Sequence, residues 1–327
     1  MRLGSLSSML PLGFVLMTFI SHCYGHDLRV GFYDGKCGGQ DIEKLIYGIV
    51  KKKIAKDPDV VSDLTRLLFH DCFVRGCDGS ILLKGNHTEQ KAHINKHVAG
   101  MDDIDDIKKA VEKVCPGVVS CTDVLVMAAR DAGFLAGGKR YDVETGRRDG
   151  RVSSSKEAEA SLPPPTIPVN KAIQMFAKNG LNEREFVVLL GGHTVGTAHC
   201  NSFKNRLYNF NNTQKPDPTI NSALLPLLCK TCPLHSQSEN ETFLDHNPTS
   251  HFKMDNDYYK QIVAHNGTLE IDQNLAINPL TRGIVEELAN SPDQFLNEFG
   301  PAMVKMARIG VLTGDRGEIR KTCASVN

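Results

Sequence analysis

The chain has 327 residues, and its 38 Lys and Arg residues balance 38 Asp and Glu residues, so the formal net charge is zero. That balance argues against nucleic acid as a partner, because neutralising phosphates usually requires a clear excess of basic residues. A chain of this length can bury a sizeable core, either as one large domain or as two lobes.

The N-terminal segment predicts a secretory signal peptide over residues 1–25. Arg2 precedes an apolar run over residues 9–20, and Cys23 and Gly25 offer small side chains at the positions that a signal peptidase reads. The run is short for a membrane span, and no later stretch approaches the ~20 apolar residues of a transmembrane helix. We therefore expect a mature domain over residues 26–327 without membrane association; an N-terminal anchor is the alternative.

Beyond this segment, hydrophobic periodicity predicts a mainly helical chain. Apolar residues recur at helical spacing from Ile42 to Val50 and from Ile104 to Val114, and Asp57 with Pro58 ends the first stripe. Three further helix starts are marked by Ser120 with Asp123, Asn182 with Glu185, and Ser291 before Pro292. Gly310 is expected to close the last of these helices.

Alternating apolar patterns are scarce, so strands are expected to be short and few, with one near Tyr141–Val143. Residues 201–250 are rich in Asn, Pro, Thr and Ser, which predicts a long and largely irregular excursion. Pro163, Pro164 and Pro165 cannot continue a helix, and they predict an extended, stiff strap on the surface.

Arg66 and His70 form the first functional pattern. They lie four residues apart, so on a helix they share a face, and Phe69 lies beside them. Together they suit a reaction that needs a base, an acid and a cation. An imidazole can be both base and acid, and a guanidinium provides the cation. The alternative is a pair of solvent-facing side chains, although the neighbouring leucines make this helix too apolar for full exposure.

The residues that follow His70 suit a calcium ion. Asp71, Asp78 and Ser80 offer hard oxygen atoms, while Gly76 and Gly79 permit tight turns that aim backbone carbonyls inward. Hard oxygens from a compact loop are the ligands that Ca²⁺ prefers. A structural turn without metal is the alternative.

His193 forms the second functional pattern. It ends an apolar helical run and follows Gly191 and Gly192, which would let a flat macrocycle approach the backbone closely. A neutral imidazole at this place can ligate haem iron. A lone histidine after an apolar helix is more often a capping or core residue, so the wider motif has to be weighed.

Two longer strings, residues 66–80 and 188–196, resemble the distal and proximal motifs of secreted plant-type (class III) haem peroxidases. Shorter motifs at 119–123, 145–150 and 319–323 fit the same family, so the resemblance spans nearly the whole mature chain. It implies a mainly α, two-lobed helical fold with very few short strands and with haem between the distal and proximal lobes. Tyr141 departs from the family, which usually has tryptophan there.

On the distal side, the resemblance implies that His70 and Arg66 cleave the peroxide bond, with Phe69 beside them. Asn95, six residues after Glu89, matches the family's partner for the far ring nitrogen of His70. A distal calcium takes side-chain ligands from Asp71, Asp78 and Ser80 and backbone carbonyls from Val74 and Gly76.

On the proximal side, the resemblance implies that His193 ligates the haem iron and that Asp272 accepts a hydrogen bond from its far ring nitrogen. Such a carboxylate favours oxidation chemistry over reversible gas binding. A proximal calcium uses Thr194 and Asp255, and its other side chains come from Asp245 or Asn247 and from Ser250 or Thr249.

The cysteines fit an oxidising compartment. Ten are present, and Cys23 belongs to the predicted signal, which leaves an odd set of nine. Local reach suggests Cys72–Cys77, and the resemblance adds Cys37–Cys115, Cys121–Cys323 and Cys200–Cys232. Cys229 is then spare, either as a free thiol or as a competitor of Cys232 for Cys200. N-glycosylation sequons begin at Asn86, Asn211, Asn240 and Asn266.

Taken together, the resemblance implies a secreted enzyme with one haem b and two calcium ions. It reduces hydrogen peroxide to water and oxidises small phenolic donors in one-electron steps at an exposed haem edge, where the family contacts donors through the residue matching Pro163. A monomer is expected. The short tail after Cys323 favours the extracellular space or apoplast over the vacuole.

Two other functions are compatible with parts of the sequence. One is a catalytically idle, calcium-stabilised extracellular protein on the same fold that binds haem or the cell wall; the intact Arg66, His70 and His193 speak against it. The other is a secreted zinc hydrolase that uses His193 and His199. Their six-residue spacing does not place both on one helix face, and no Glu lies between them to act as base.

Overall fold

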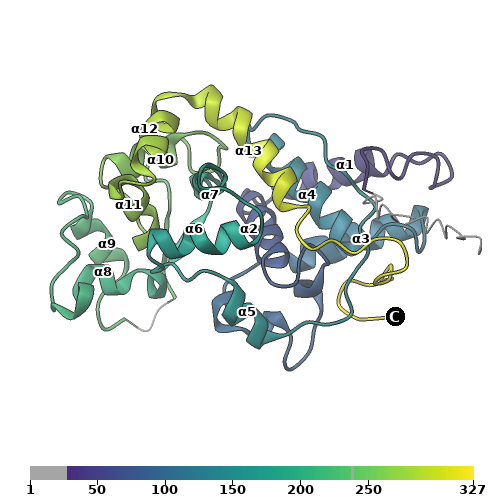
Figure 1. Cartoon of the computed structure of the whole chain (residues 1–327), viewed down its shortest axis with the longest axis horizontal. Coiled ribbons are helices and arrows are strands. Elements are labelled where there is room, and N and C mark those ends of the chain that lie inside the picture. The colour runs from purple at the N-terminus through teal and green to yellow at the C-terminus, as the bar shows by residue number, and fades with distance from the viewer. Residues whose placement is uncertain (1–27, 237–238) are drawn as a thin grey trace, which may run out of the picture.

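A computed structural model describes residues 28–236 and 239–327 of the chain (Figure 1). In this part of the chain α-helices dominate and the strands form one small sheet, which confirms the mainly helical prediction. The predicted signal peptide over residues 1–25 lies outside the described residues. None of the described helices is both long enough and apolar enough to cross a bilayer.

The elements are as follows. The α-helices are α1 (Ile42–Ile54), α2 (Val60–Cys72), α3 (Met101–Val114), α4 (Cys121–Leu135), α5 (Ser155–Ser161), α6 (Val169–Lys178), α7 (Glu183–Leu190), α8 (Lys204–Tyr208), α9 (Leu225–Thr231), α10 (Asp257–Val263), α11 (Glu270–Ile277), α12 (Arg282–Asn290) and α13 (Pro292–Met306). Short 3-10 helices are η1 (Ser80–Leu82), η2 (Glu89–Lys91), η3 (His93–Asn95), η4 (Gly191–Thr194), η5 (Cys200–Ser202) and η6 (Phe210–Asn212). The strands are β1 (Thr197–His199) and β2 (Glu241–Phe243).

The first group of helices packs around α4, which contacts α1, α2 and α3. All residues of α4 from Cys121 to Gly133 are buried, as expected for a helix that is apolar on most sides. The Ser120 hydroxyl caps this helix by accepting from the Asp123 amide at 3.1 Å. The Asp123 carboxylate does not complete the expected capping box, because it accepts from the Tyr33 hydroxyl at 2.7 Å and from the Arg147 guanidinium at 2.8 Å.

The second group contains α7 and α10–α13. Helix α10 packs against α11 and α12, and α13 packs against α7 and α12. A full capping box starts α7: the Asn182 side chain accepts from the Glu185 amide at 2.8 Å, and the Glu185 carboxylate accepts from the Asn182 amide at 2.7 Å. Helix η4 follows α7 and packs against α2, so the two groups meet there (Figure 1).

The only sheet within the described ranges pairs β1 and β2 antiparallel, with Ala198 opposite Thr242. The strand expected near Tyr141–Val143 is therefore wrong, although an isolated bridge joins Arg29 to Thr145 nearby. Tyr141 instead packs against α13, where a Cβ on Gly300 would lie 2.7 Å from its ring. Residues 201–250 are also more regular than expected, because they include α8, α9 and β2.

The C-terminal segment returns to the loop that follows α2. Helix α13 ends at Met306, four residues before the Gly310 that was expected to close it. Gly310 has a different role: its φ of 56° is left-handed, and a Cβ on Gly76 would lie 2.6 Å from its Cα. The Cys77 amide donates to the Ile309 carbonyl at 2.8 Å in the same place.

Four disulfides join the pairs named above: Cys37–Cys115, Cys72–Cys77, Cys121–Cys323 and Cys200–Cys232. Cys229 is a free, half-buried thiol. It lies three residues before Cys232 at the end of α9, and the Tyr208 hydroxyl lies 3.3 Å from the Cys229 carbonyl and 2.8 Å from that of Cys232. Cys200 is therefore bonded to Cys232 and not to Cys229.

This arrangement predicts a specific alkylation pattern. In folded protein without reductant, a small alkylating reagent should modify Cys229 slowly, because the thiol is only half-buried, and should leave Cys200 and Cys232 unmodified. Peptide mass mapping before and after reduction measures this directly. Alkylated Cys232 together with a Cys200–Cys229 linked peptide would show that the other pairing is populated.

Candidate active site

One face of α2 carries a row of polar side chains. Asp59, which precedes the helix, and Asp63, Arg66 and His70 within it are spaced by four, three and four residues, so they follow one stripe. The opposite face buries apolar residues such as Leu64 and is packed against α4. The stripe therefore faces away from the centre of the first helix group.

Hydrogen bonds fix both the orientation and the tautomer of His70. The Arg66 Nε–H donates to His70 Nε2 at 3.2 Å, so Nε2 must be the ring nitrogen without a proton. The Nδ1–H then donates to Asn95 Oδ1 at 2.7 Å. Asn95 is itself oriented, because its Nδ2 donates to the Glu89 carbonyl at 2.9 Å. The predicted partners of His70 are thus brought together from α2, η2 and η3.

His70 is held in its neutral, basic form. Burial lowers its pKa from the ordinary 6.5 to about 3, and the positive charge of Arg66 acts in the same direction. An imidazole in this state can accept a proton at Nε2 over a wide range of pH. Phe69 packs beside it, edge-to-face at 5.4 Å between ring centroids, and also stacks with Phe176 of α6.

The loop after His70 buries acidic groups. Asp71 accepts from the Gly79 amide at 3.0 Å, and Asp78 accepts from the Ser80 amide at 3.0 Å. Burial raises the pKa of Asp71 well above its usual range, and the charges of Asp78 and Glu89 add to this effect. The Ser80 hydroxyl and both carboxylate oxygens of Glu89 are buried without a hydrogen-bond partner. Such a set of oxygen atoms suits a cation.

The C-terminal segment closes this loop from outside. The Arg320 guanidinium donates to the carbonyl of Gly79 at 2.6 Å and to that of Asp78 at 3.2 Å. The Arg320 amide donates to Asp149, whose carboxylate also accepts from the amides that begin α4. These bonds engage the backbone carbonyls at 78 and 79. The carbonyls of Val74 and Gly76 stay predicted ligands, as the resemblance implies.

His193 lies in η4, directly after α7. Gly191 is needed here for a reason other than the expected approach of a macrocycle: a Cβ at this position would lie 2.3 Å from the Tyr259 hydroxyl and 2.4 Å from the Phe295 ring. Gly192 has room, since the nearest side-chain atom to its Cβ position, from Thr65 of α2, is 3.7 Å away. Gly191 therefore permits close packing of η4 against α10 and α13, and the approach of a macrocycle at this place stays a prediction.

A buried carboxylate holds the His193 ring. His193 Nδ1 lies 2.9 Å from Asp272 Oδ1, and Asp272 is buried in α11. The Tyr258 hydroxyl of α10 donates to the same Oδ1 at 2.9 Å. Because Nδ1–H donates to the carboxylate, Nε2 is the nitrogen that can ligate a metal, and 35% of the His193 side chain is exposed.

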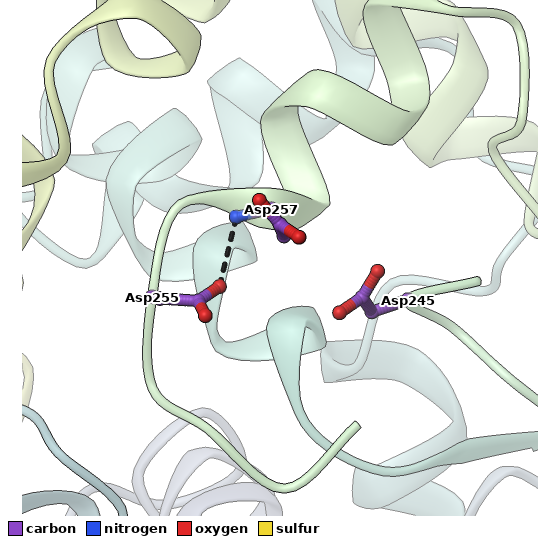
Figure 2. A group of neighbouring side chains, drawn as sticks. All are labelled: Asp245, Asp255 and Asp257. Atoms are coloured by element: carbon purple, nitrogen blue, oxygen red, sulfur yellow. Dashed lines mark hydrogen bonds between the residues drawn. The ribbon is translucent and has the colours of Figure 1, made fainter. Parts of the chain in front are cut away.

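Three further carboxylates gather beside His193. Asp245, Asp255 and Asp257 each present an oxygen, and these oxygens lie within 4.8 Å of one another (Figure 2). The Thr194 hydroxyl lies 3.2 Å from Asp255, and the Ser250 hydroxyl lies 2.5 Å from Asp245. The structure thus brings together Thr194, Asp245, Ser250 and Asp255.

Of the alternatives, Asn247 lies at the edge of the cluster and donates to the Asp257 carboxylate. Thr249 is exposed and bonds to the Asn247 side chain instead. Asp257 itself was missed at the sequence level. The sequence could have indicated Asp257 as a further ligand, because Asp255-Asn256-Asp257 offers two carboxylates directly before Tyr258.

Two stacked histidines connect the segment between η3 and α3 with strand β1. His97 and His199 stack with ring centroids 3.7 Å apart, and the His97 carbonyl accepts from Arg66 at 2.9 Å. A Cβ on Gly196, just before β1, would lie 2.6 Å from the Ser62 side chain of α2. His199 therefore pairs with His97, and the described residues give no support to a zinc site made with His193.

The strap expected over residues 161–165 is only partly extended, because Ser161 still belongs to α5 and a turn follows in which the Ile167 amide donates to the Pro164 carbonyl at 3.0 Å. Pro163 is half-buried, and the Pro165 carbonyl accepts from the Ile271 amide at 3.0 Å. Because Ile271 precedes Asp272, this bond anchors the strap to α11, the helix whose Asp272 lies beside His193.

Sequence comparisons decide which family this site belongs to. A family model described as peroxidase matches residues 46–291. Peroxidase 60 of Arabidopsis thaliana is 44% identical over 319 residues, or 97% of this chain and 95% of that protein. Peroxidase 57 of the same plant is 40% identical over the full length of both proteins. Peroxidase 5 of Vitis vinifera is 42% identical over 92% of each. The chain belongs to the peroxidase family.

This membership confirms the resemblance to plant-type (class III) haem peroxidases and, with the helical architecture, the predicted fold class. The chain is a peroxidase enzyme, and the idle binding protein on the same fold is not favoured. The family implies haem and calcium as cofactors in general terms, and hydrogen peroxide with donor molecules as substrates.

Asp63 is a charged neighbour of this peroxidase's site that the motifs did not indicate. It lies one helical turn before Arg66, and burial together with the charges of Asp59 and Asp103 raises its pKa from 3.8 to about 7. Helical spacing alone could have placed it on the His70 face. Its burial depends on the rest of the fold and is invisible in the sequence.

The raised pKa of Asp63 has a consequence for stability. The folded state holds the Asp63 proton more tightly than the unfolded state does. The stabilisation that this proton gives to the fold is therefore complete below the ordinary pKa of 3.8 and is lost as pH rises through about 7. Asp63→Asn should therefore raise the free energy of unfolding at pH 8 by about 1–3 kcal/mol, and leave it unchanged near pH 4. Denaturant unfolding at both pH values measures this.

The matched control is Asp102→Asn on α3, whose carboxylate is 94% exposed. Its free energy of unfolding should follow that of the unmodified protein at both pH values. An Asp63→Asn variant that is less stable than the unmodified protein at pH 8 would contradict the assignment of Asp63 as a destabilising buried charge.

Proposed function

We propose that this peroxidase binds one haem b between α2 and η4, with His193 Nε2 as the iron ligand and with Arg66 and His70 on the opposite side. The observation that carries the proposal is the pair of fixed imidazoles. His70 Nδ1 is held by Asn95, and His193 Nδ1 is held by Asp272, so Nε2 is the unprotonated nitrogen of each ring. Haem in this position supplies the redox-active iron at which peroxide is cleaved.

His70 moves the proton in this reaction. Its unprotonated Nε2 would accept the proton from one oxygen of hydrogen peroxide and return it to the other oxygen, which would leave as water. Arg66 donates to Nε2 at 3.2 Å, which supports a role for its guanidinium in stabilising negative charge on the leaving oxygen. Asn95 keeps the proton on Nδ1 throughout, which leaves Nε2 as the exchanging atom.

His193 and Asp272 set the electron donation to the iron. A carboxylate that accepts from Nδ1–H gives the imidazole partial imidazolate character, and this favours oxidised states of the metal. Asp272 is 1% exposed, so water does not weaken this bond.

Two calcium sites support the two histidines in this proposal. The distal ion takes oxygens from Asp71, Asp78, Ser80, Val74 and Gly76, and the partnerless oxygens of Ser80 and Glu89 support a cation there. The proximal ion takes Thr194, Asp245, Ser250 and Asp255, with Asp257 as a further candidate. Each cation offsets buried negative charge that is otherwise costly.

The donors are small phenols that lose one electron each at an exposed edge near Pro163, so the enzyme needs no tight donor pocket. Secretion to the extracellular space is supported by the four disulfides, which form and persist in oxidising compartments. The monomeric state and the domain over residues 26–327 stay predictions.

His70→Ala tests the proposed mechanism. The variant should retain haem, because His193 is intact, and should react with hydrogen peroxide at least 100-fold more slowly, since its general acid–base group is lost. Stopped-flow absorbance at the haem band measures this rate. His93→Ala removes an exposed imidazole of η3 and should react at the normal rate. A His70→Ala variant with normal peroxide reactivity would refute the role of His70, and haem indifferent to peroxide in the unmodified protein would favour the idle binder.

Calcium removal tests the two sites separately. Purified protein should contain two calcium ions per chain, Asp71→Asn and Asp255→Asn should each contain one, and a chelator should lower the melting temperature of the unmodified protein. The loss in stability arises because each removed cation leaves buried carboxylates uncompensated. Elemental analysis and thermal unfolding measure both. A count of two in either variant would remove that residue from the ligand set.

A further inference from the structure

Tyr258 is a third member of the group that holds His193. It is buried in α10, and its hydroxyl donates to Asp272 Oδ1 at 2.9 Å. That oxygen is the one that lies 2.9 Å from His193 Nδ1. The Tyr258 ring also packs edge-to-face on the imidazole, with 5.9 Å between ring centroids. Tyr258 thus contacts both halves of the His193–Asp272 pair.

Two donors that share one carboxylate oxygen compete for its charge. A hydrogen bond to an ionised acceptor is roughly twice as strong as a neutral one, so the tyrosine draws substantial electron density from Oδ1. The bond from His193 Nδ1–H to that oxygen is correspondingly weaker than it would be without the tyrosine. Burial of all three groups enhances the effect, because water does not screen it.

We infer that Tyr258 is a positioning residue that limits the imidazolate character of His193. The inference rests on the proposed function, because it requires His193 to ligate haem iron. The chain gives Tyr258 a second connection: Asp257, a member of the acidic cluster beside Thr194, immediately precedes it at the start of α10. The tyrosine therefore links the candidate proximal calcium site to the charge on Asp272.

The same chain offers a matched control. Tyr259 is adjacent on α10, equally buried, and its hydroxyl donates to the backbone carbonyls of Val187 and Val188 at 3.0 and 3.3 Å. Tyr259→Phe removes one buried hydroxyl from the same helix without changing the donors to Asp272. Any general effect of losing a tyrosine hydroxyl in α10 should appear in both variants, and an effect on His193 should appear only in Tyr258→Phe.

The test uses haem-loaded enzyme and two measurements other than activity. In Tyr258→Phe, the Asp272 carboxylate keeps only the His193 donor, so the iron–histidine stretching frequency of the ferrous protein should rise in resonance Raman spectra. The ferric/ferrous reduction potential should fall by the equivalent of a threefold to tenfold change in equilibrium constant, where tenfold corresponds to about 59 mV for one electron. Tyr259→Phe should show neither change.

Three outcomes would overturn the inference. An unchanged stretching frequency and potential in Tyr258→Phe would show that the hydroxyl does not act on His193. Shifts in the opposite direction would contradict competition for Oδ1, and equal shifts in both variants would reduce the effect to packing of α10. Failure of the proposed function is distinguishable, because unmodified protein would then lack any iron–histidine stretching band.

Discussion

The active site depends on one kind of interaction, a hydrogen bond given by the Nδ1–H of each functional histidine to a fixed side-chain oxygen. Asn95 accepts from His70, and Asp272 accepts from His193. The neutral amide fixes the His70 tautomer without adding a charge, whereas a carboxylate partner would make His193 a stronger electron donor to a bound metal. In the proposed function, the two acceptors would therefore assign proton transfer to one imidazole and metal ligation to the other. Much of the surrounding structure serves to hold these acceptors.

The residue directly after each histidine belongs to, or bonds with, a group of acidic side chains in the folded chain. Asp71 follows His70, and Thr194, which bonds to Asp255, follows His193. Buried carboxylates destabilise a fold unless cations or amides compensate them. Their position next to the functional residues makes local order depend on that compensation, so an ion bound there would fix a histidine as well as stabilise the fold. The Cys72–Cys77 disulfide and the bonds from Arg320 restrain the same distal loop covalently and electrostatically.

The features that could be predicted from the sequence are those that arise from spacing within a short segment. The four-residue separation of Arg66 and His70 placed both on one helix face, and Asn182 with Glu185 marked the start of α7. Residues whose roles depend on distant packing were missed or misread. Gly191 is required by Tyr259 and Phe295, which follow it by more than sixty residues. Asp63 and Tyr258 acquire their environments only from the fold, and the strand near Tyr141 fails because that ring packs onto Gly300.

Arg66 has an acidic neighbour and a histidine neighbour on the same face of α2. It lies between Asp63, three residues before it, and His70, four residues after it, so both side chains compete for its positive charge. An ionised Asp63 draws that charge away from His70, and a protonated Asp63 leaves it directed toward His70 Nε2. Burial and the neighbouring Asp59 raise the pKa of Asp63 to about 7, so a large fraction of Asp63 is neutral under mildly acidic conditions. The acidic start of α2 can thus coexist with a guanidinium that donates to His70 Nε2.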